Sequence, residues 1–416
     1  MVVRRNIKRT VRMGIAVLGV ILMMCSCGKD KDNAKKTEST ESTESTESTE
    51  STENTDSTEA EKDTESEKGT ENAKDTKDTD AETTKKTGRS KDSKNKNLLA
   101  GMERVEQYDF QGALESFESA LLNNEDAELT YRGQGIAYMG LGNYAEAEKA
   151  FLRSIANAQG TPTALIYDTN YYLASAYMKQ GKYADAEQIY SAVIGLKKKE
   201  KDAYYLRACA VLLQGRYEDA VADFEKAFSL DPGDLELVTD AYVEMQAAGY
   251  AEQGKSYLQK FMTQKEKNLK DGEKGIIYFY LEDYENARKY LDPFVNGTDA
   301  KLSLILGQTY EKLGDMNYAS VVYQTYLGSN EPDAAIYNSL GICLMNQGKY
   351  AEAVAAFESG IAMGASDYLQ ELKFNMIVAN EYTGNFSQAK TMMQEYLQTY
   401  PDDARAKKEN EFLKTR

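Results

Sequence analysis

The sequence predicts an all-α protein: a solenoid of about nine helix–turn–helix units over residues 98–416, preceded by a disordered linker. Its aromatic marker returns after 34 residues, from Phe110 to Tyr144 and from Tyr183 to Tyr217, and such a fixed period indicates stacked repeats. Within a unit, apolar residues follow helical spacing on both sides of a glycine turn. The motif itself recurs as GNYAEAEKAF, GKYADAEQIY, GRYEDAVADF and GKYAEAVAAF.

The composition of the chain limits what it can do. It has 416 residues, a formal net charge of −17 and no histidine. An acidic chain repels a phosphate backbone, so nucleic acid is not expected as a partner. Without histidine there is no Ser-His-Asp triad, no Cys-His dyad and no His-ligated metal. Phosphate-loop, EF-hand and HExxH motifs do not occur either. The sequence therefore predicts no enzyme, no metal and no cofactor.

The first residues have the order of an export signal. A basic stretch that includes Arg4 and Arg12 precedes the apolar run Met13–Met24. Twelve residues are too few to span a bilayer. Met24-Cys25-Ser26-Cys27 follows, and this context resembles a bacterial lipoprotein signal. The resemblance implies a signal peptide over residues 1–26, a lipidated Cys27, and location on the extracytoplasmic side of the cell membrane. An uncleaved anchor or an ordinary signal stays open.

Residues 27–97 have the composition of a tether. Ser, Thr, Glu and Lys dominate, and residues 37–53 read TESTESTESTESTESTE. Such a segment has too few large apolar side chains to bury a core and is expected to be disordered. It would hold the folded part clear of the membrane.

Residues 131–155 illustrate one unit. Tyr131, Gly135 and Tyr138 follow i, i+4, i+7 spacing, which is one face of a helix. Gly142 and Asn143 then interrupt the helical pattern. A second amphipathic face follows, formed by Tyr144, Ala147, Phe151 and Ile155. Each unit is therefore expected to be a pair of helices joined by a tight turn.

These units resemble the tetratricopeptide repeat (TPR), a right-handed α-solenoid with small residues where its two helices cross. The crossing pairs are Gly135/Ala147, Ala174/Ala186, Ala208/Ala220, Gly307/Ala319 and Gly341/Ala353. The resemblance is specific in units two, three, four and eight and poor in five and six. Unit five has Gly254 where alanine is expected, and unit six has Glu282 in place of the turn glycine. The final stretch, DDARAKKENEFLKTR, fits a capping helix.

The resemblance also implies a concave groove lined by the first helix of each unit, where TPR domains hold peptides. An apolar peptide or helix with one acidic anchor, held by Arg132, is the expected ligand. Packing between neighbouring helices is the competing role for each of these side chains. Cys209 and Cys343 are interpreted as small buried hydrophobes. The candidate groove residues are Arg132, Ile136, Met139, Tyr171, Met178, Tyr205 and Leu212.

The predicted function is that of a lipid-anchored TPR scaffold that binds another protein or peptide at the cell envelope. A binding lipoprotein for a small molecule or a glycan is the alternative, because exposed tyrosines could stack on sugars.

Overall fold

The structure is a computed structural model that describes residues 94–160, 164–364, 368–401 and 403–416. Throughout these ranges the regular structure is helical, with no strand, which confirms the all-α prediction. The predicted signal peptide, Cys27 and the tether up to residue 93 lie outside the described residues. The first described unit begins with a helix at Lys96 rather than at the predicted boundary, Leu98.

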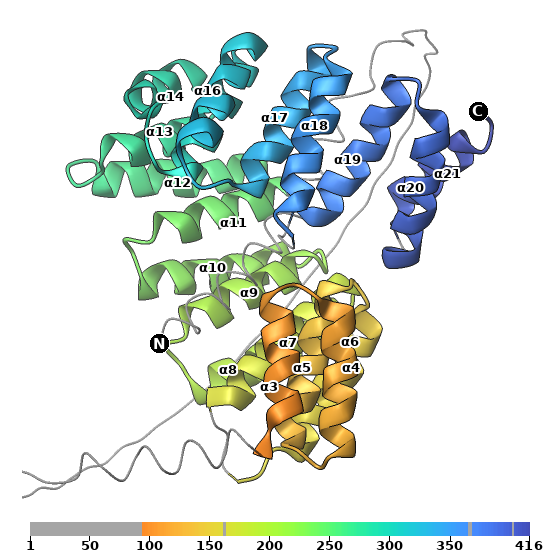
Figure 1. Ribbon diagram of the computed structural model, residues 1–416. Coiled ribbons are helices and arrows are strands. Elements are labelled where there is room, and N and C mark those ends of the chain that lie inside the picture. Colours follow the sequence, from red (N-terminus) through yellow and green to blue (C-terminus); the bar gives the residue numbers. More distant parts are fainter. Residues whose placement is uncertain (1–93, 161–163, 365–367, 402) are drawn as a thin grey trace, which may run out of the picture.

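The helices form nine pairs, each with a first helix A and a second helix B (Figure 1). This agrees with the predicted number of units. The pairs are α3 (Lys96–Glu106) with α4 (Phe110–Leu122), α5 (Ala127–Gly140) with α6 (Tyr144–Asn157), α7 (Ala164–Lys179) with α8 (Tyr183–Leu196), α9 (Lys201–Leu212) with α10 (Tyr217–Leu230), α11 (Leu235–Ala247) with α12 (Ala251–Lys265), α13 (Asp271–Tyr280) with α14 (Tyr284–Leu291), α15 (Ala300–Lys312) with α16 (Met316–Ser329), α17 (Ala334–Asn346) with α18 (Tyr350–Ala362), and α19 (Leu369–Tyr382) with α20 (Phe386–Thr399).

The pairs stack in chain order. Each helix from α3 to α21 packs against the next, and in most units helix A also touches helix A of the following unit. A short 3₁₀ helix, η1 (Asp292–Phe294), follows α14, and α21 (Ala404–Leu413) packs on α20 at the C-terminal end. Because each unit contacts mainly its neighbours, the fold is an α-solenoid with a continuous core.

Small residues let the two helices of a unit approach closely. A methyl group added at Gly135 would lie 2.4 Å from Cε1 of Phe151 on helix B, which is far inside contact distance. Gly341 has the same relation to Phe357, at 2.3 Å. The sequence prediction that the crossing needs small residues is therefore confirmed, and the group that occupies the space is the aromatic side chain of helix B.

The turns between helices are also set by local sequence. Gly142 has φ +69°, a conformation that costs glycine least, and the side chain of Asn143 then accepts a hydrogen bond from the amide of Glu146 to cap α6. An aspartate caps several of the A helices in the same way, as Asp126 does for α5 and Asp234 for α11. Glycine turns and side-chain caps of this kind fix where these helices start.

Units five and six depart from this pattern, as the sequence indicates. In unit five the large residue Tyr242 lies on helix A at the crossing, and Gly254 faces it from helix B. In unit six Glu282 takes the turn position with φ +63°, an unusual conformation for a residue with a Cβ. Cys209 and Cys343 are buried, and no disulfide joins them, as predicted.

Candidate functional site

The predicted groove residues are mostly buried. Ile136 and Met139 are half-buried and pack beside the cluster that contains Phe151. Tyr171 and Tyr205 are 2% and 0% exposed. The other three candidates, Arg132, Met178 and Leu212, are also buried. The structure thus places most of the predicted groove residues inside the helix packing, and their part in binding stays a prediction.

The two tyrosines contact helix B of their own unit. The Tyr171 ring lies 6.1 Å from that of Tyr190, and the Tyr205 ring lies 5.9 Å from that of Phe224, both at tilted angles. All four belong to one core cluster, together with Met178 and Leu212. The competing role, packing between helices, therefore accounts for much of the contact area of these residues.

Arg132 does not stand as a free anchor for an acidic group. Its guanidinium carbon lies 5.3 Å from the centre of the Tyr172 ring, a cation–π contact between units two and three. Its Nε has no hydrogen-bond partner among the described residues. Arg132 thus joins two units while keeping one unused donor.

Carboxyl groups in and beside three consecutive A helices raise the pKa values of the two tyrosines, a feature that the sequence-based prediction missed. Burial raises the pKa of Tyr171, and the charges of Glu200, Asp202 and Asp168 raise it further. We call five carboxyl residues the acidic face: Asp168 of α7, Glu200 just before α9, Asp202 of α9, and Asp240 and Glu244 of α11.

Tyr205 has a similar environment. Burial, the Cys209 thiol and then the charges of Asp240 and Glu244 raise its pKa well above the usual value. The acidic face could have been suspected from the aspartates and glutamates of these helices, but their convergence depends on how the units stack.

Glu244 is the most unusual member of the acidic face. It is 5% exposed, and its Oε1 has no hydrogen-bond partner among the described residues. Burial and the charge of Asp240 raise its pKa to about 8, and Lys179 partly opposes this. A buried carboxyl group without a full set of partners is costly for the fold and is therefore notable.

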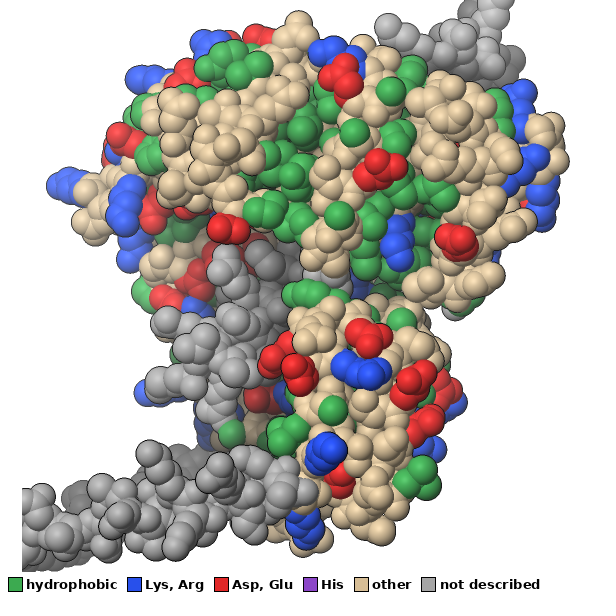
Figure 2. Space-filling model, viewed as in Figure 1, with side chains coloured by type: hydrophobic (Ala, Val, Ile, Leu, Met, Phe, Trp, Pro, Cys, Tyr) green, Lys and Arg blue, Asp and Glu red, His purple; other side chains and the backbone are tan. Residues whose placement is uncertain are grey.

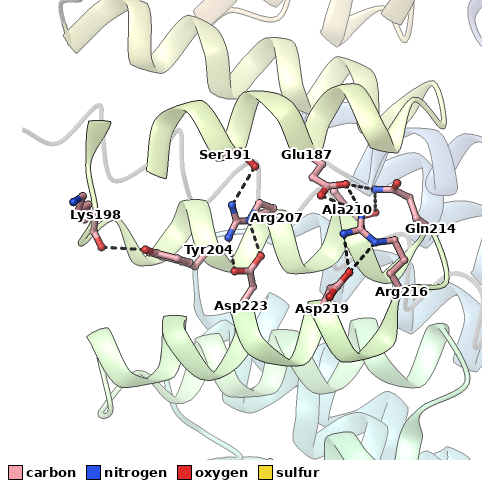
Figure 3. Close-up of polar contacts among 10 residues, drawn as sticks. All are labelled: Glu187, Ser191, Lys198, Tyr204, Arg207, Ala210, Gln214, Arg216, Asp219 and Asp223. Carbon is pink, nitrogen blue, oxygen red and sulfur yellow. Dashed lines mark hydrogen bonds and ion pairs between the residues drawn. The ribbon is translucent and has the colours of Figure 1, made fainter. Parts of the chain in front are cut away.

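A polar clamp repeats between units two, three and four. Glu148 accepts hydrogen bonds from Gln180 (2.9 Å) and Lys182 (2.6 Å) of the next unit. Glu187 accepts from Gln214 and Arg216, each at 2.8 Å (Figure 3). The repetition at equivalent positions holds these units in the same relative orientation.

Figure 3 also shows a second contact between units three and four. Arg207 donates two hydrogen bonds to the carboxylate of Asp223, at 2.6 and 2.7 Å, and a third to Ser191 Oγ at 3.1 Å. Both charged side chains are largely buried, and the paired geometry is the strong form of this interaction. The pair of Arg207 and Asp223 joins the two helices of unit four, and the bond to Ser191 links that unit to unit three.

One face of the surface shows where charged and apolar side chains gather. On the face drawn in Figure 2, acidic and basic side chains are interspersed over the lower block of helices, and hydrophobic side chains gather in the upper half. Across the part of the chain that the structure describes, no group of three or more Cys, Asp and Glu side chains is arranged to hold a metal ion. Searched over the same residues, the helices include none with the length and apolar character that a membrane crossing needs.

The stacked pairs define an α-solenoid, and the comparisons identify its type. The tetratricopeptide repeat family matches residues 98–162, 171–234 and 306–368, and a second description of the same repeat matches residues 371–403. These matches cover more than half of the chain. The protein therefore belongs to the tetratricopeptide repeat family and is a TPR scaffold, and no catalytic family is indicated.

Curated relatives are similar over parts of the chain. The anaphase-promoting complex subunit CDC16 of Saccharomyces cerevisiae is 25% identical over 233 residues, which is 52% of this chain and 27% of that protein. Outer envelope protein 61 of Arabidopsis thaliana is 28% identical over 134 residues, 29% of this chain and 24% of that protein. The chain thus spans about a quarter of the length of these relatives.

A solved structure of similar type is a tetratricopeptide repeat protein from Parabacteroides merdae. It is 16% identical to this chain with a TM-score of 0.39, covering 61% of this chain and 98% of that one.

Proposed function

We propose that this protein is a lipid-anchored scaffold that binds another protein at the outer side of the cell membrane. The TPR stack supplies a long, rigid surface, because each unit is fixed against its neighbours. The tether, residues 27–97, supplies reach, and anchoring at Cys27 raises the local concentration of the scaffold near the membrane.

The observation that carries the binding part of the proposal is the family match over four stretches of the chain. Repeat solenoids use extended surfaces rather than enclosed pockets, so a polypeptide is the ligand class that fits. CDC16, a relative over half of this chain, is by its name a subunit of a multiprotein complex. Fold alone does not identify a partner, so the proposal extends to the class only.

Cross-linking on intact membranes tests the binding part. The full chain with a C-terminal affinity tag is cross-linked in the cells that produce it, and bound proteins are identified by mass spectrometry. We expect one or a few proteins, enriched over the tagged residues 1–97 alone and joined to the solenoid by mapped cross-links. Recovery of the same proteins with residues 1–97 alone would contradict the proposal.

Intact-mass measurement tests the anchoring part. The membrane-extracted protein should begin at Cys27 and carry the added mass of lipid, and Cys27→Ser should remove both the lipid and the membrane association. Cys25→Ser is the matched control, because it changes a neighbouring thiol and should leave both unchanged. Lipid retained in the Cys27→Ser variant would exclude this anchoring site.

A further inference from the structure

The two ends of the solenoid meet, although they are far apart in the sequence. A methyl group added at Gly142, in the turn of unit two, would lie 3.2 Å from Cδ1 of Tyr400, which follows helix B of unit nine. One added at Gly364, after helix B of unit eight, would lie 3.5 Å from Cδ2 of Tyr108 in the turn of unit one. The last units, blue in Figure 1, thus touch the first units, which are orange and yellow.

The two contacts occupy equivalent positions in their units. Tyr108 and Gly142 each come directly before the residue that caps helix B, and both have a positive φ, +64° and +69°. Gly364 and Tyr400 each follow the end of helix B. In both contacts a unit meets the unit seven places further along the chain, with a tyrosine on one side and a glycine on the other. This repetition indicates a regular superhelix that closes on itself.

The turns of the later units make no such contact. A methyl group added at their turn glycines would meet no atom of the described residues within 4 Å. These glycines are Gly181, Gly215, Gly249, Gly314, Gly348 and Gly384. Units three to nine have no unit seven places further along, so the contact occurs only where the register allows it.

The electrostatics of Tyr400 agree with this contact. Burial, and then Tyr144 and Glu371, raise the pKa of Tyr400 to about 12. Tyr144 begins helix B of unit two, and Glu371 lies on helix A of unit nine. Burial and the charge of Glu371 also raise the pKa of Tyr144. Groups on the two sides of the contact therefore act on one another.

These contacts are small compared with those that join neighbouring units. Each involves one ring, and Tyr108 remains 51% exposed, whereas consecutive helices pack along their lengths. Such a contact can break without unstacking a repeat, because every unit keeps its neighbours. Closed and open forms of the solenoid are therefore close enough in free energy to exchange.

Closure controls how a partner reaches the A helices. Neighbouring A helices touch in most units, whereas among the described residues neighbouring B helices make no comparable contact, so the A helices form the inner layer of the curve. An internal segment of a folded partner cannot be threaded along the axis from one end. It reaches the inner layer from the side, through the seam at which the first two units meet the last two.

We propose that the two tyrosine–glycine contacts form a clasp, which holds this seam closed and opens to admit a polypeptide segment to the A helices. The inference rests on the proposed function for the class of partner, and it adds a step that controls access. A partner that binds the inner layer only in the open form shifts the population towards that form by the difference in its affinities.

Cysteine cross-linking of the full chain tests whether the clasp exists. Gly142→Cys with Tyr400→Cys should react with a short, reducible bis-maleimide, and mass spectrometry of the peptides locates the link. Gly215→Cys with Tyr400→Cys is the matched control, because Gly215 has the same positive φ in a turn without the contact, and it should react at least about tenfold more slowly. Equal rates would overturn the proposal. Circular dichroism checks folding, and Tyr108→Cys with Gly364→Cys is the second pair if the first does not fold.

A substitution at the other contact tests whether the two act together. Tyr108→Ala should slow the cross-link between positions 142 and 400 about threefold, because it removes the ring that holds the same seam. Tyr382→Ala removes an exposed ring that stacks on Tyr350 and should leave the rate unchanged. An unchanged rate in Tyr108→Ala would contradict a single clasp made of both contacts.

A locked chain tests access. The purified full chain with the link between positions 142 and 400 closed is mixed with detergent-solubilised membranes, and the proteins that cross-link to the solenoid in cells are quantified. The locked chain should recover them at least about fivefold less, and reduction of the linker should restore recovery.

The outcomes separate the clasp from the proposed function. Equal recovery by the locked and the reduced chain would refute control of access and leave the scaffold function standing. Recovery of no protein by the wild-type chain, here and in cells, would contradict the scaffold function, and the cross-linking rates would then decide whether the clasp exists.

Discussion

Units two to four and units five to six solve the same packing problem with different residues. In unit two the small residues are Gly135 and Ala147, and the aromatic ring of Phe151 covers them. In unit five the bulky residue is on helix A, Tyr242, and the space for it comes from Gly254 on helix B. The helix crossing therefore requires small residues but does not fix which helix carries them.

The links between units differ as well. The clamp that joins units two, three and four ends at unit four, where the equivalent of Glu148 is Val221. Between units four and five the rings of Tyr217 and Tyr250 stack instead, 4.2 Å apart. Between units five and six the ion pair is reversed, with Lys255 on helix B and Glu282 on the next turn, 3.2 Å apart.

These differences explain where the family signature is lost. The matched stretches leave out residues 235–305, which contain units five and six, although α11 to α14 form the same pairs as elsewhere. A repeat can thus keep its helices while losing the residues by which its family is recognised. The comparison teaches that packing volume, rather than residue identity, maintains the stack.

The largest expected effect is the loss of an aromatic side chain at the crossing. Phe224→Ala in unit four should lower the free energy of unfolding by about 3–5 kcal/mol, because it leaves a cavity in a fully buried site. Leu291→Ala is the matched change in unit six and should cost about 2–3 kcal/mol. Urea denaturation measures both. If Leu291→Ala lowered the free energy of unfolding more than Phe224→Ala does, the aromatic crossing of unit four would not be the more stabilising of the two.

Overpacking the crossings should have the next largest effect. Ala147→Leu, Ala186→Leu and Ala220→Leu should each cost about 1–3 kcal/mol, and Gly254→Leu should cost a similar amount in unit five. Adding Tyr242→Ala should relieve much of the loss from Gly254→Leu, because the deleted ring makes room; thermal melting of the single and double variants gives this coupling. Strict additivity would mean that Tyr242 and Gly254 do not share one space.

A smaller effect should depend on pH. The pKa of Glu244 is raised from 4.5 to about 8 by burial, so the unfolded chain releases its proton before the folded chain does. Stability from this group is therefore retained below about pH 4.5 and is lost as the pH rises towards about 8. Glu244→Gln should be on the order of 1–2 kcal/mol more stable than wild type at pH 9 and equal to it at pH 4.

The exposed substitution Glu358→Gln is the control for that comparison. It should leave the pH dependence of urea denaturation unchanged. Curves for wild type and Glu244→Gln that run parallel from pH 4 to pH 9 would contradict the buried, unpaired state of this carboxyl group.

The smallest expected effect concerns the polar clamp. Glu187→Gln removes an ion pair with the half-exposed Arg216, and such pairs contribute only about 0.2–1 kcal/mol. Hydrogen exchange at the junction of α8 and α9 should increase slightly, whereas Glu218→Gln, on the exposed side of α10, should have no effect there. A loss above about 2 kcal/mol would mean that the clamp controls stacking more strongly than surface ion pairs do.

Much of the fold could be predicted because its determinants are local. The turn at Gly142 and the small residue Gly135 lie within one unit, so a single chain segment reveals them, and the period appears directly as the recurrence of the motif along the sequence. In unit five the large residue at the crossing is Tyr242 on helix A, and the small one is Gly254 on helix B. The sequence pattern identifies Gly254 as an exception but does not show that Tyr242 lies against it. A residue that departs from the repeat pattern can be seen in the sequence. The residue that compensates for it is found only from the contact between the two side chains in the structure.

The candidate site was less predictable because it depends on several units at once. Helical spacing placed Tyr171 and Tyr205 on the correct helices, yet it could not tell how deeply each ring would be covered. Which carboxyl groups act on each tyrosine depends on how neighbouring units stack, and no single repeat specifies that stacking. Non-local geometry of this kind determines the sign of the charge around the tyrosines.

Native-state hydrogen exchange of the free full chain tests most directly whether the regular and irregular regions differ as described. Amides of α5 to α10 should exchange slowest, because repeated clamps and aromatic crossings stabilise units two to four. Among helices inside the stack, α13 and α14 should exchange fastest, because they are short, with 10 and 8 residues, and follow the Lys255–Glu282 junction. Exchange in α13 and α14 as slow as in α5 to α10 would contradict the account.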